Sequence, residues 1–245
     1  LFDLGVSSHQ IDQPDRGFAY RFDGTLDMRM NQVISTTESV ECDDKSNETL
    51  TALKIVNTFS LEDLENILSK YGDEPRAHLI AAEIILSRPL ISTASLRDAI
   101  CSMTPAKYQI KTLSRCFQAL RIVVNNEIEV LEDALAAVYK VTKPGGRLVV
   151  LSYHSLEDRV IKNLLRRHSH AKADKYHELK MKKKHMDQVD IAIDTTVVTP
   201  TASGVKDDSR GLWRPVFKKP IMPTRAEMKE NSRSRSAKLR VAEKV

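Results

Sequence analysis

Cysteine, long apolar runs and glycine-rich loops are all scarce in this sequence of 245 residues. The three cysteines, Cys42, Cys101 and Cys116, are scattered and form no C-x-x-C pair. Neither a disulfide framework nor a zinc site is therefore expected, and a reducing compartment is the default. No run approaches the ~20 apolar residues of a membrane span. No G-x-G pattern occurs, which argues against a nucleotide-binding enzyme with a phosphate-cradling loop.

The first residues also lack an initiator Met and any leader-like segment, because the chain opens directly in strand-like sequence. We therefore expect a fragment of a longer protein. This expectation bears on the candidate site described below.

Charge is unevenly distributed along the chain, although the net charge is only +5. Residues 162–184 contain nine Lys or Arg against two acids, and residues 214–245 contain ten against three. Residues 31–50 carry five acids against one Lys. Two basic regions predict a polyanionic partner, most simply nucleic acid, and the alternative is a solvated basic surface.

The opening stretch, residues 1–12, is interpreted as the end of a strand that runs into a polar loop. Asp3 lies among the apolar Leu1, Phe2 and Leu4, just before Gly5. In open α/β sheets, ligands bind beyond the carboxyl ends of the strands, where a carboxylate can accept a hydrogen bond from an amine. The alternative is a plain turn, since Asp, Gly and Ser are common turn residues.

A loop follows at residues 12–30, with no helical or strand period. It is rich in aromatic residues and Arg. Phe18, Tyr20 and Phe22 are candidates to stack on a base, with the alternative that they pin the loop to the core. Residues 31–50 are Ser/Thr/acid-rich and read as a flexible insertion.

Three helices are predicted between residues 60 and 105. The first is capped by Ser60, the second runs from about Pro75 to Ser87, and the third starts near Thr93. A longer helix is predicted from Arg115 to Lys140, because apolar residues recur at intervals of three and four.

An α/β pattern follows this helix. A Pro-Gly-Gly turn at 144–146 leads into the apolar run 147–152, as expected of a buried parallel strand. Ser155 is predicted to cap a further helix, with Asp158 completing the capping box. Helix, turn, buried strand, polar loop and capped helix indicate a doubly wound α/β unit. Residues 169–210 are interpreted as a loop, and residues 213–221 and 236–242 as two strands joined by a helical segment at 224–230.

Several blocks of this sequence together resemble the MraW/RsmH family of S-adenosylmethionine-dependent methyltransferases. The resemblance covers nearly the whole chain except residues 31–57 and 169–210. The blocks are Asp3-Leu-Gly-Val-Ser-Ser, Gln10-Ile-Asp, Arg16-Gly-Phe, Asp23-Gly-Thr-Leu-Asp-Met-Arg-Met, Arg115-Cys-Phe-Gln-Ala-Leu-Arg, Pro144-Gly-Gly-Arg-Leu, Ser152-Tyr-His-Ser-Leu-Glu-Asp-Arg and Arg233-Ser-Arg-Ser-Ala-Lys-Leu-Arg.

The resemblance implies methyl transfer from S-adenosylmethionine to the N4 amine of a cytidine in the decoding centre of small-subunit ribosomal RNA. It implies a Rossmann-like class I methyltransferase sheet, incomplete at its N-terminus, with an inserted helical domain. On this basis residues 1–58 and 113–245 form the methyltransferase core, and residues 59–112 form the helical substrate-recognition domain. The family's Gly-rich cofactor loop is expected upstream of Leu1.

The resemblance assigns cofactor contacts to Asp3 and Gln10. We expect Asp3 to hold the cytosine amine, with Ser7 adding a polar contact. His154 follows the buried strand and is a candidate to orient the base or to take up the released proton. Its alternative is a structural role beside the helix cap. The predicted site includes no metal.

The RNA partner is expected to meet a set of basic residues: Arg16, Arg21, Arg29, Arg233, Arg235 and Lys238. The alternative function is a non-catalytic RNA- or ribosome-binding fragment that lacks the cofactor glycine loop. Small-subunit ribosomal RNA, or the small subunit itself, is the expected partner, no membrane is expected, and a homodimer is left open. The tryptophan before Lys218 and Lys219 resembles the mitochondrial branch, which predicts the mitochondrial matrix, with the cytoplasm as the bacterial alternative.

Overall fold

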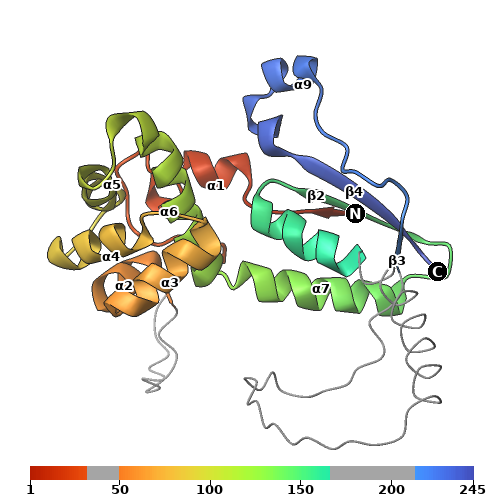
Figure 1. Ribbon diagram of the computed structural model, residues 1–245, viewed down its shortest axis with the longest axis horizontal. Helices are drawn as coiled ribbons and strands as arrows, with labels where there is room; N and C mark the ends of the chain where they lie inside the picture. Colours follow the sequence, from red (N-terminus) through yellow and green to blue (C-terminus); the bar gives the residue numbers. More distant parts are fainter. Residues whose placement is uncertain (32–49, 166–212) are drawn as a thin grey trace, which may run out of the picture. The chain divides into compact units, whose positions relative to one another are not determined.

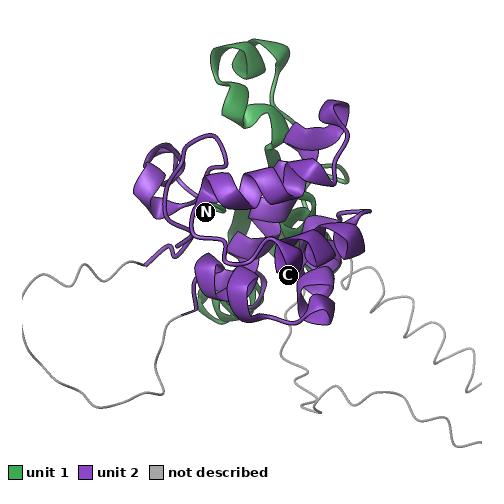
Figure 2. Cartoon of the chain, turned by 90° about the vertical axis from the view of Figure 1, so that its left-hand side faces the viewer, with its two compact units in different colours: residues 1–5, 130–245 green, residues 6–129 purple. Residues whose placement is uncertain are grey.

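The computed structural model describes residues 1–31, 50–165 and 213–245 of the chain. These residues group into two compact units, shown in Figure 2. Unit 1 comprises Leu1–Gly5 and Val130–Val245, and unit 2 comprises Val6–Glu129. The predicted loop at 169–210 and the predicted insertion at 31–50 lie almost wholly outside the described residues.

Unit 1 is built on a mixed sheet of four strands in the order β1-β2-β4-β3 (Figure 1). The strands are β1 (Phe2–Asp3), β2 (Arg147–Ser152), β3 (Trp213–Pro215) and β4 (Lys238–Lys244). β1 lies parallel to β2, with Asp3 opposite Leu151. β4 lies antiparallel to both β2 and β3. The apolar run Leu148–Leu151 suits this central position, and along it buried residues alternate with half-buried ones.

The helices of unit 1 supply the rest of its core. They are α7 (Glu127–Val141, whose residues from Val130 onward belong to this unit), α9 (Arg225–Glu230) and a helix whose described part is 155–165. Short 3-10 turns follow α9 at Ser232–Ser236. Leu135 of α7 packs with Val150 of β2 and with Trp213 of β3, whose ring meets Tyr139 edge-on at 5.7 Å. The strand and the glycine turn predicted at 144–152 are confirmed.

Unit 2 is helical, and its elements surround one apolar core. The helices are α1 (Ser8–Asp12), α2 (Ala52–Thr58), α3 (Leu61–Gly72), α4 (Ala77–Leu86), α5 (Thr93–Ser102) and α6 (Gln109–Val124), with 3-10 turns at Pro14–Arg16 and Ala106–Tyr108. The predicted cap at Ser60 is confirmed, because its hydroxyl accepts the Asp63 N–H. The loop residues Leu26 and Met28 are buried in the same core as the three helices predicted between 60 and 105.

The single helix predicted from Arg115 to Lys140 is wrong, because the chain breaks it at Asn125 and Asn126. Asn126 adopts a left-handed φ of 51°, which Asn tolerates better than most residues. The Asn125 side chain donates to Met28 O at 2.7 Å and accepts the Met30 N–H at 2.7 Å. The apolar period continues across the break, so the pattern alone conceals it.

The C-terminal strands are also shorter or shifted relative to the prediction. β3 ends at Pro215, although the prediction extended to Ile221, which keeps only an isolated bridge to Leu239. Pro215 is the last residue of β3 and Pro220 directly precedes the bridge at Ile221, and neither proline has an N–H to donate to the ladder. Within the described ranges, no helix is both long and apolar enough to cross a membrane.

Candidate active site

Asp3 and Tyr153 meet at one edge of the sheet in unit 1. β1 and β2 are parallel, so both strands end at this edge. The Tyr153 hydroxyl donates to Asp3 Oδ1 at 3.0 Å. Burial, then the hydrogen bond and charge of Asp3 and the charge of Glu157, raise the pKa of Tyr153 to about 12. Tyr153 therefore stays a protonated donor at neutral pH, and it fixes the Asp3 carboxylate at the strand end.

Asp3 is exposed, and one of its two oxygens accepts the Tyr153 hydroxyl. Gly5 follows with a φ of +87°, and a Cβ placed there would lie 3.8 Å from its nearest neighbours, Tyr153 and Glu157. The strand end thus offers a carboxylate beside an open stretch of backbone. This is the kind of place where open α/β sheets bind ligands.

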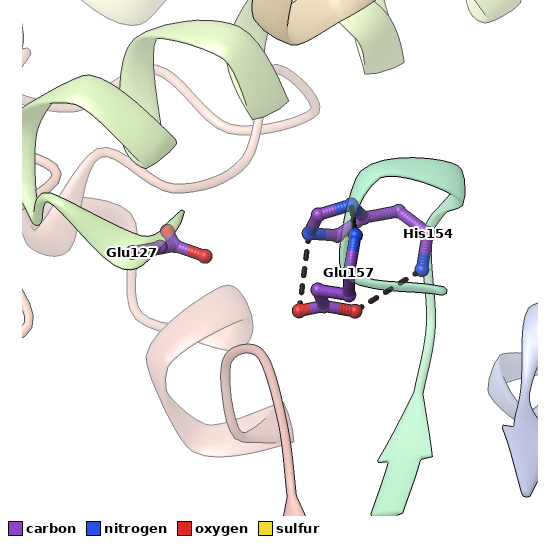
Figure 3. A group of neighbouring side chains, drawn as sticks. All are labelled: Glu127, His154 and Glu157. Atoms are coloured by element: carbon purple, nitrogen blue, oxygen red, sulfur yellow. Dashed lines mark hydrogen bonds and ion pairs between the residues drawn. The ribbon is translucent and has the colours of Figure 1, made fainter. Parts of the chain in front are cut away.

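His154 and Glu157 form the first turn of the helix that follows β2 (Figure 3). Glu157 Oε2 accepts the backbone N–H groups of Tyr153 at 2.9 Å and of His154 at 3.3 Å. His154 Nδ1 accepts the Glu157 N–H at 3.4 Å. His154 Nε2 lies 3.0 Å from Glu157 Oε1, close enough for charge attraction but out of hydrogen-bond alignment.

The Glu157 carboxylate keeps its charge despite being nearly buried. Burial acts to raise its pKa, but the nearby His154 ring and the two backbone N–H groups outweigh burial and lower it below the usual value. Both ring nitrogens of His154 face Glu157, which matches the structural alternative stated above for this residue. A catalytic role for His154 stays a prediction. Glu127, also drawn in Figure 3, belongs to unit 2, where it pairs with Arg121 at 2.7 Å.

The predicted helix cap in this region is corrected. Ser155 is the first residue of the helix, so His154 occupies the capping position and Glu157, rather than Asp158, completes the reciprocal pattern. Asp158 turns instead to β4, where it binds Arg240 at 2.7 Å and Lys238 at 3.4 Å. These two cations come from a strand about 80 residues away, which local pattern reading does not detect.

Ser7 and Gln10 cap α1 with each other. The Ser7 hydroxyl accepts the Gln10 N–H at 3.2 Å, and Gln10 Oε1 accepts the Ser7 N–H at 2.9 Å. Both predicted ligand contacts are therefore engaged locally, although the Gln10 amide N–H₂ group remains available to donate. Their roles toward a cofactor or substrate stay predictions.

The predicted RNA contacts of the loop at 12–30 differ in how accessible they are. Arg16 is directed inward and donates to the carbonyls of Arg29 and Met30. Arg29 makes a two-pronged pair with Asp27 at 2.7 and 2.8 Å. Arg21 is the more exposed one, 4.0 Å from Asp12. Arg21 is therefore the best placed of the three to reach a phosphate.

The predicted RNA contacts near the C-terminus also differ in how exposed their side chains are. Arg233 and Arg235 are exposed on the 3-10 turns, whereas Lys238 lies near Asp158. The basic region at 162–184 lies outside the described residues from residue 166 onward.

The aromatic residues of the 12–30 loop mostly pin it to the core. Phe18 is buried, and Tyr20 meets Phe117 edge-on at 5.7 Å. Phe22 remains partly exposed, beside Arg21. Phe18 and Tyr20 therefore fit the alternative stated above, in which the aromatic rings attach the loop to the core.

Sequence reasoning missed Tyr153 and Glu157 as members of this site. Both stand in the Ser152-Tyr-His-Ser-Leu-Glu block, so a signal was present in the sequence. Tyr153 immediately follows the buried strand and is the first side chain positioned at its carboxyl end, which was the cue available.

Comparisons with known proteins agree on one family. The sequence profile described as the MraW methylase family matches residues 1–212 and 205–245. A protein of Mesoplasma florum named ribosomal RNA small subunit methyltransferase H is 42% identical, and the alignment covers all of this chain and 68% of that protein. Proteins of the same name are 38% identical in Lactobacillus gasseri and 41% identical in Caldicellulosiruptor saccharolyticus, with 67% and 69% of those proteins covered.

Proposed function

We infer the function from one premise: this chain belongs to the MraW methylase family. It is accordingly an S-adenosylmethionine-dependent methyltransferase of small-subunit ribosomal RNA. We propose that the target is the N4 amine of a cytidine and that the fold of the whole protein is the doubly wound class I sheet. The mixed sheet of unit 1, with β1 parallel to β2, supports that fold.

The observation that carries the proposal is the exposed Asp3 carboxylate at the carboxyl end of β1, held by the Tyr153 hydroxyl. The N4 amine of cytosine is a poor nucleophile because its lone pair is delocalised into the ring. A carboxylate that accepts one N–H localises the lone pair and fixes its direction. Asp3 has an oxygen for this, since only Oδ1 is bound by Tyr153.

The cofactor, when bound, supplies the methyl group as a sulfonium. It would give its methyl carbon to N4 and leave as the thioether, and the amine would lose a proton. Asp3 is the group that we assign to orient the amine, and the proton leaves through Asp3 to solvent. The open backbone at Gly5 and the free oxygen of Asp3 fit the amino end of this cofactor as well, so Asp3 has a second role there. The contact assigned to Gln10 remains part of this proposal.

The test measures methyl transfer from labelled S-adenosylmethionine to small ribosomal subunits, with the modified nucleoside identified by mass spectrometry. Asp3→Ala should reduce turnover at least ~100-fold, the range for loss of a general acid–base group. Asp98→Ala is the matched control, because Asp98 is exposed on α5 and, among the residues that the structure describes, forms an ion pair only with its neighbour Arg97. Calorimetry with S-adenosylmethionine then separates the two roles of Asp3: unchanged cofactor binding with lost turnover assigns Asp3 to the amine.

Turnover of Asp3→Ala within about twofold of the Asp98→Ala control would refute the proposal for Asp3. A methylated product other than N4-methylcytidine would refute the target. The relatives named above are bacterial, and the mitochondrial matrix and the homodimer remain predictions.

A further inference from the structure

A small cavity in unit 2 gathers three basic side chains, one from the residue before α4 and two from the first two turns of α6. Its volume is about 220 Å³, and its lining includes Arg76, Lys111, Arg115, Glu74 and Tyr108. This volume is below the ~300–1,000 Å³ of pockets for drug-sized ligands, so it suits one phosphate and part of a sugar. None of these residues is among the RNA contacts predicted from the sequence.

The only acid in this lining is turned inward and fixes the frame of the cavity. The Glu74 side chain is 2% exposed. Its Oε1 accepts the Arg76 N–H at 3.2 Å, and its Oε2 accepts Arg115 Nη1 at 3.4 Å. Glu74 therefore offsets part of the charge of Arg115 and leaves the rim positive.

The other two cations retain donors for a ligand. Arg76 uses Nη1 to hold Met103 O at 3.0 Å, which fixes the guanidinium in place. Lys111 is exposed and makes no hydrogen bond or ion pair with the described residues. Like charges collected around one cavity repel each other, and a bound anion relieves that repulsion.

The start of α4 adds to the positive potential. α4 has no side-chain cap at Arg76 and no acidic residue in its first turn. The Arg76 and Ala77 N–H groups are taken by Glu74, and the helix dipole favours an anion beside the N–H groups that follow them. Tyr108 is about half exposed, and the Lys107 ammonium lies 4.7 Å from the centre of its ring. An exposed aromatic ring beside cations is the arrangement on which proteins stack an unpaired base.

We propose that this cavity binds a backbone phosphate of single-stranded RNA and that Tyr108 stacks on a neighbouring base. The inference rests on the proposed function, because the RNA substrate supplies the ligand. The family resemblance implies that the helical unit recognises the substrate but gives no site for it. The proposal assigns that site to the cavity.

The test measures the affinity of the full chain for a labelled single-stranded RNA of about 12 nucleotides, by anisotropy over a range of salt concentrations. Lys111→Gln should weaken binding about three- to tenfold and make the slope of log K against log salt shallower by about 0.7, the value for one phosphate contact on a single strand. Adding Tyr108→Ala should weaken binding at least about fivefold further.

Lys70→Gln is the matched control. Lys70 is exposed and lies over the ring of its neighbour Tyr71, as Lys107 lies over that of Tyr108, but neither Lys70 nor Tyr71 lines the cavity. Lys70→Gln should therefore leave affinity and salt slope unchanged. All variants should keep the melting temperature of the parent, since the altered side chains are exposed. Equal losses for Lys70→Gln and Lys111→Gln would overturn the proposal.

Competition separates RNA from a free nucleotide as the source of the phosphate. Cytidine monophosphate at millimolar concentration should not displace the RNA. If it displaces RNA from the parent protein but not from Lys111→Gln, the cavity is a mononucleotide site and the assignment is overturned. Binding is read without methyl transfer, so the two hypotheses fail separately. If the enzyme is active but Lys111→Gln leaves its RNA affinity unchanged, only the cavity proposal is refuted. If RNA binding depends on Lys111 but no methylation is detected, only the proposed reaction is refuted.

Discussion

The Tyr153 hydroxyl and the Asp3 carboxylate join two residues that are 150 positions apart in the sequence. One hydrogen bond to a charged group contributes about 1.5–3 kcal/mol and sets the direction of the oxygen that remains. Tyr153 acts through Asp3 and is therefore a positioning residue. Its effect on the reaction should appear in turnover more than in binding.

Tyr153→Phe removes only the hydroxyl, and we expect kcat to fall about tenfold while KM for the RNA changes less than about twofold. Because the pKa of Tyr153 is raised to about 12, the hydroxyl is protonated throughout pH 6–9, so the pH profile of the variant should keep the shape of the parent's. Tyr139→Phe is the control, since Tyr139 contacts Trp213 and Lys244 through its ring. A profile that changes shape would instead indicate that Tyr153 titrates during the reaction.

At the scale of elements, one ion pair ties the helix after β2 to β4. Asp158 binds Arg240 at 2.7 Å, and both side chains are nearly buried, with 13% and 12% exposed. Burial acts to raise the pKa of Asp158, but Arg240, followed by Lys238, outweighs it and lowers the pKa below the usual value. The pair therefore stabilises the fold wherever Asp158 is ionised.

Asp158→Asn should lower the free energy of unfolding at neutral pH by about 2 kcal/mol, between the values for exposed and for fully buried pairs. Because the folded pKa is the lower one, this contribution is present above the unfolded pKa near 3.9 and is lost as pH falls through the folded value. The difference in stability between parent and variant, from denaturant melts at pH 7 to pH 2, should shrink only below about pH 4.

Asp98→Asn controls for the loss of an ion pair in general. The Asp98 side chain is 70% exposed and that of its partner Arg97 is 36% exposed, and pairs open to solvent contribute about 0–1 kcal/mol. A difference for Asp158→Asn that stays constant down to pH 2 would mean that packing, rather than charge, links the helix to β4.

At the scale of the whole molecule, the excess of positive charge predicts how affinity for RNA depends on salt. Arg21, Arg233 and Arg235 are exposed, as is Lys111 at the cavity in unit 2. If these side chains neutralise about four phosphates, log K should fall with log salt at a slope of about −3.

Filter binding of ribosomal RNA fragments at ~50–300 mM salt measures this slope. A slope near zero would exclude the phosphate contacts. Arg16→Gln should leave the slope unchanged, because the Arg16 guanidinium donates hydrogen bonds to the carbonyls of Arg29 and Met30.

Several features followed from the sequence because their causes are local. The apolar run of β2 and the Pro-Gly-Gly turn before it depend on neighbours in the chain, as do the cap at Ser60 and the position of Asp3 at a strand end. The sequence blocks also identified the family, since family motifs are patterns of the sequence itself. The apolar period of α6 and α7 could also be predicted, because it is a pattern of neighbouring residues.

Tertiary structure alone decided where these local patterns stop. The break at Asn125 serves hydrogen bonds to Met28 and Met30, almost 100 residues earlier, and Asp158 leaves its expected cap for Arg240 on β4. Tyr153 reaches Asp3 only because β1 and β2 are paired in parallel. Each of these contacts depends on groups that are distant in the chain. A pattern of neighbouring residues does not show which distant group the folded chain brings within hydrogen-bond distance.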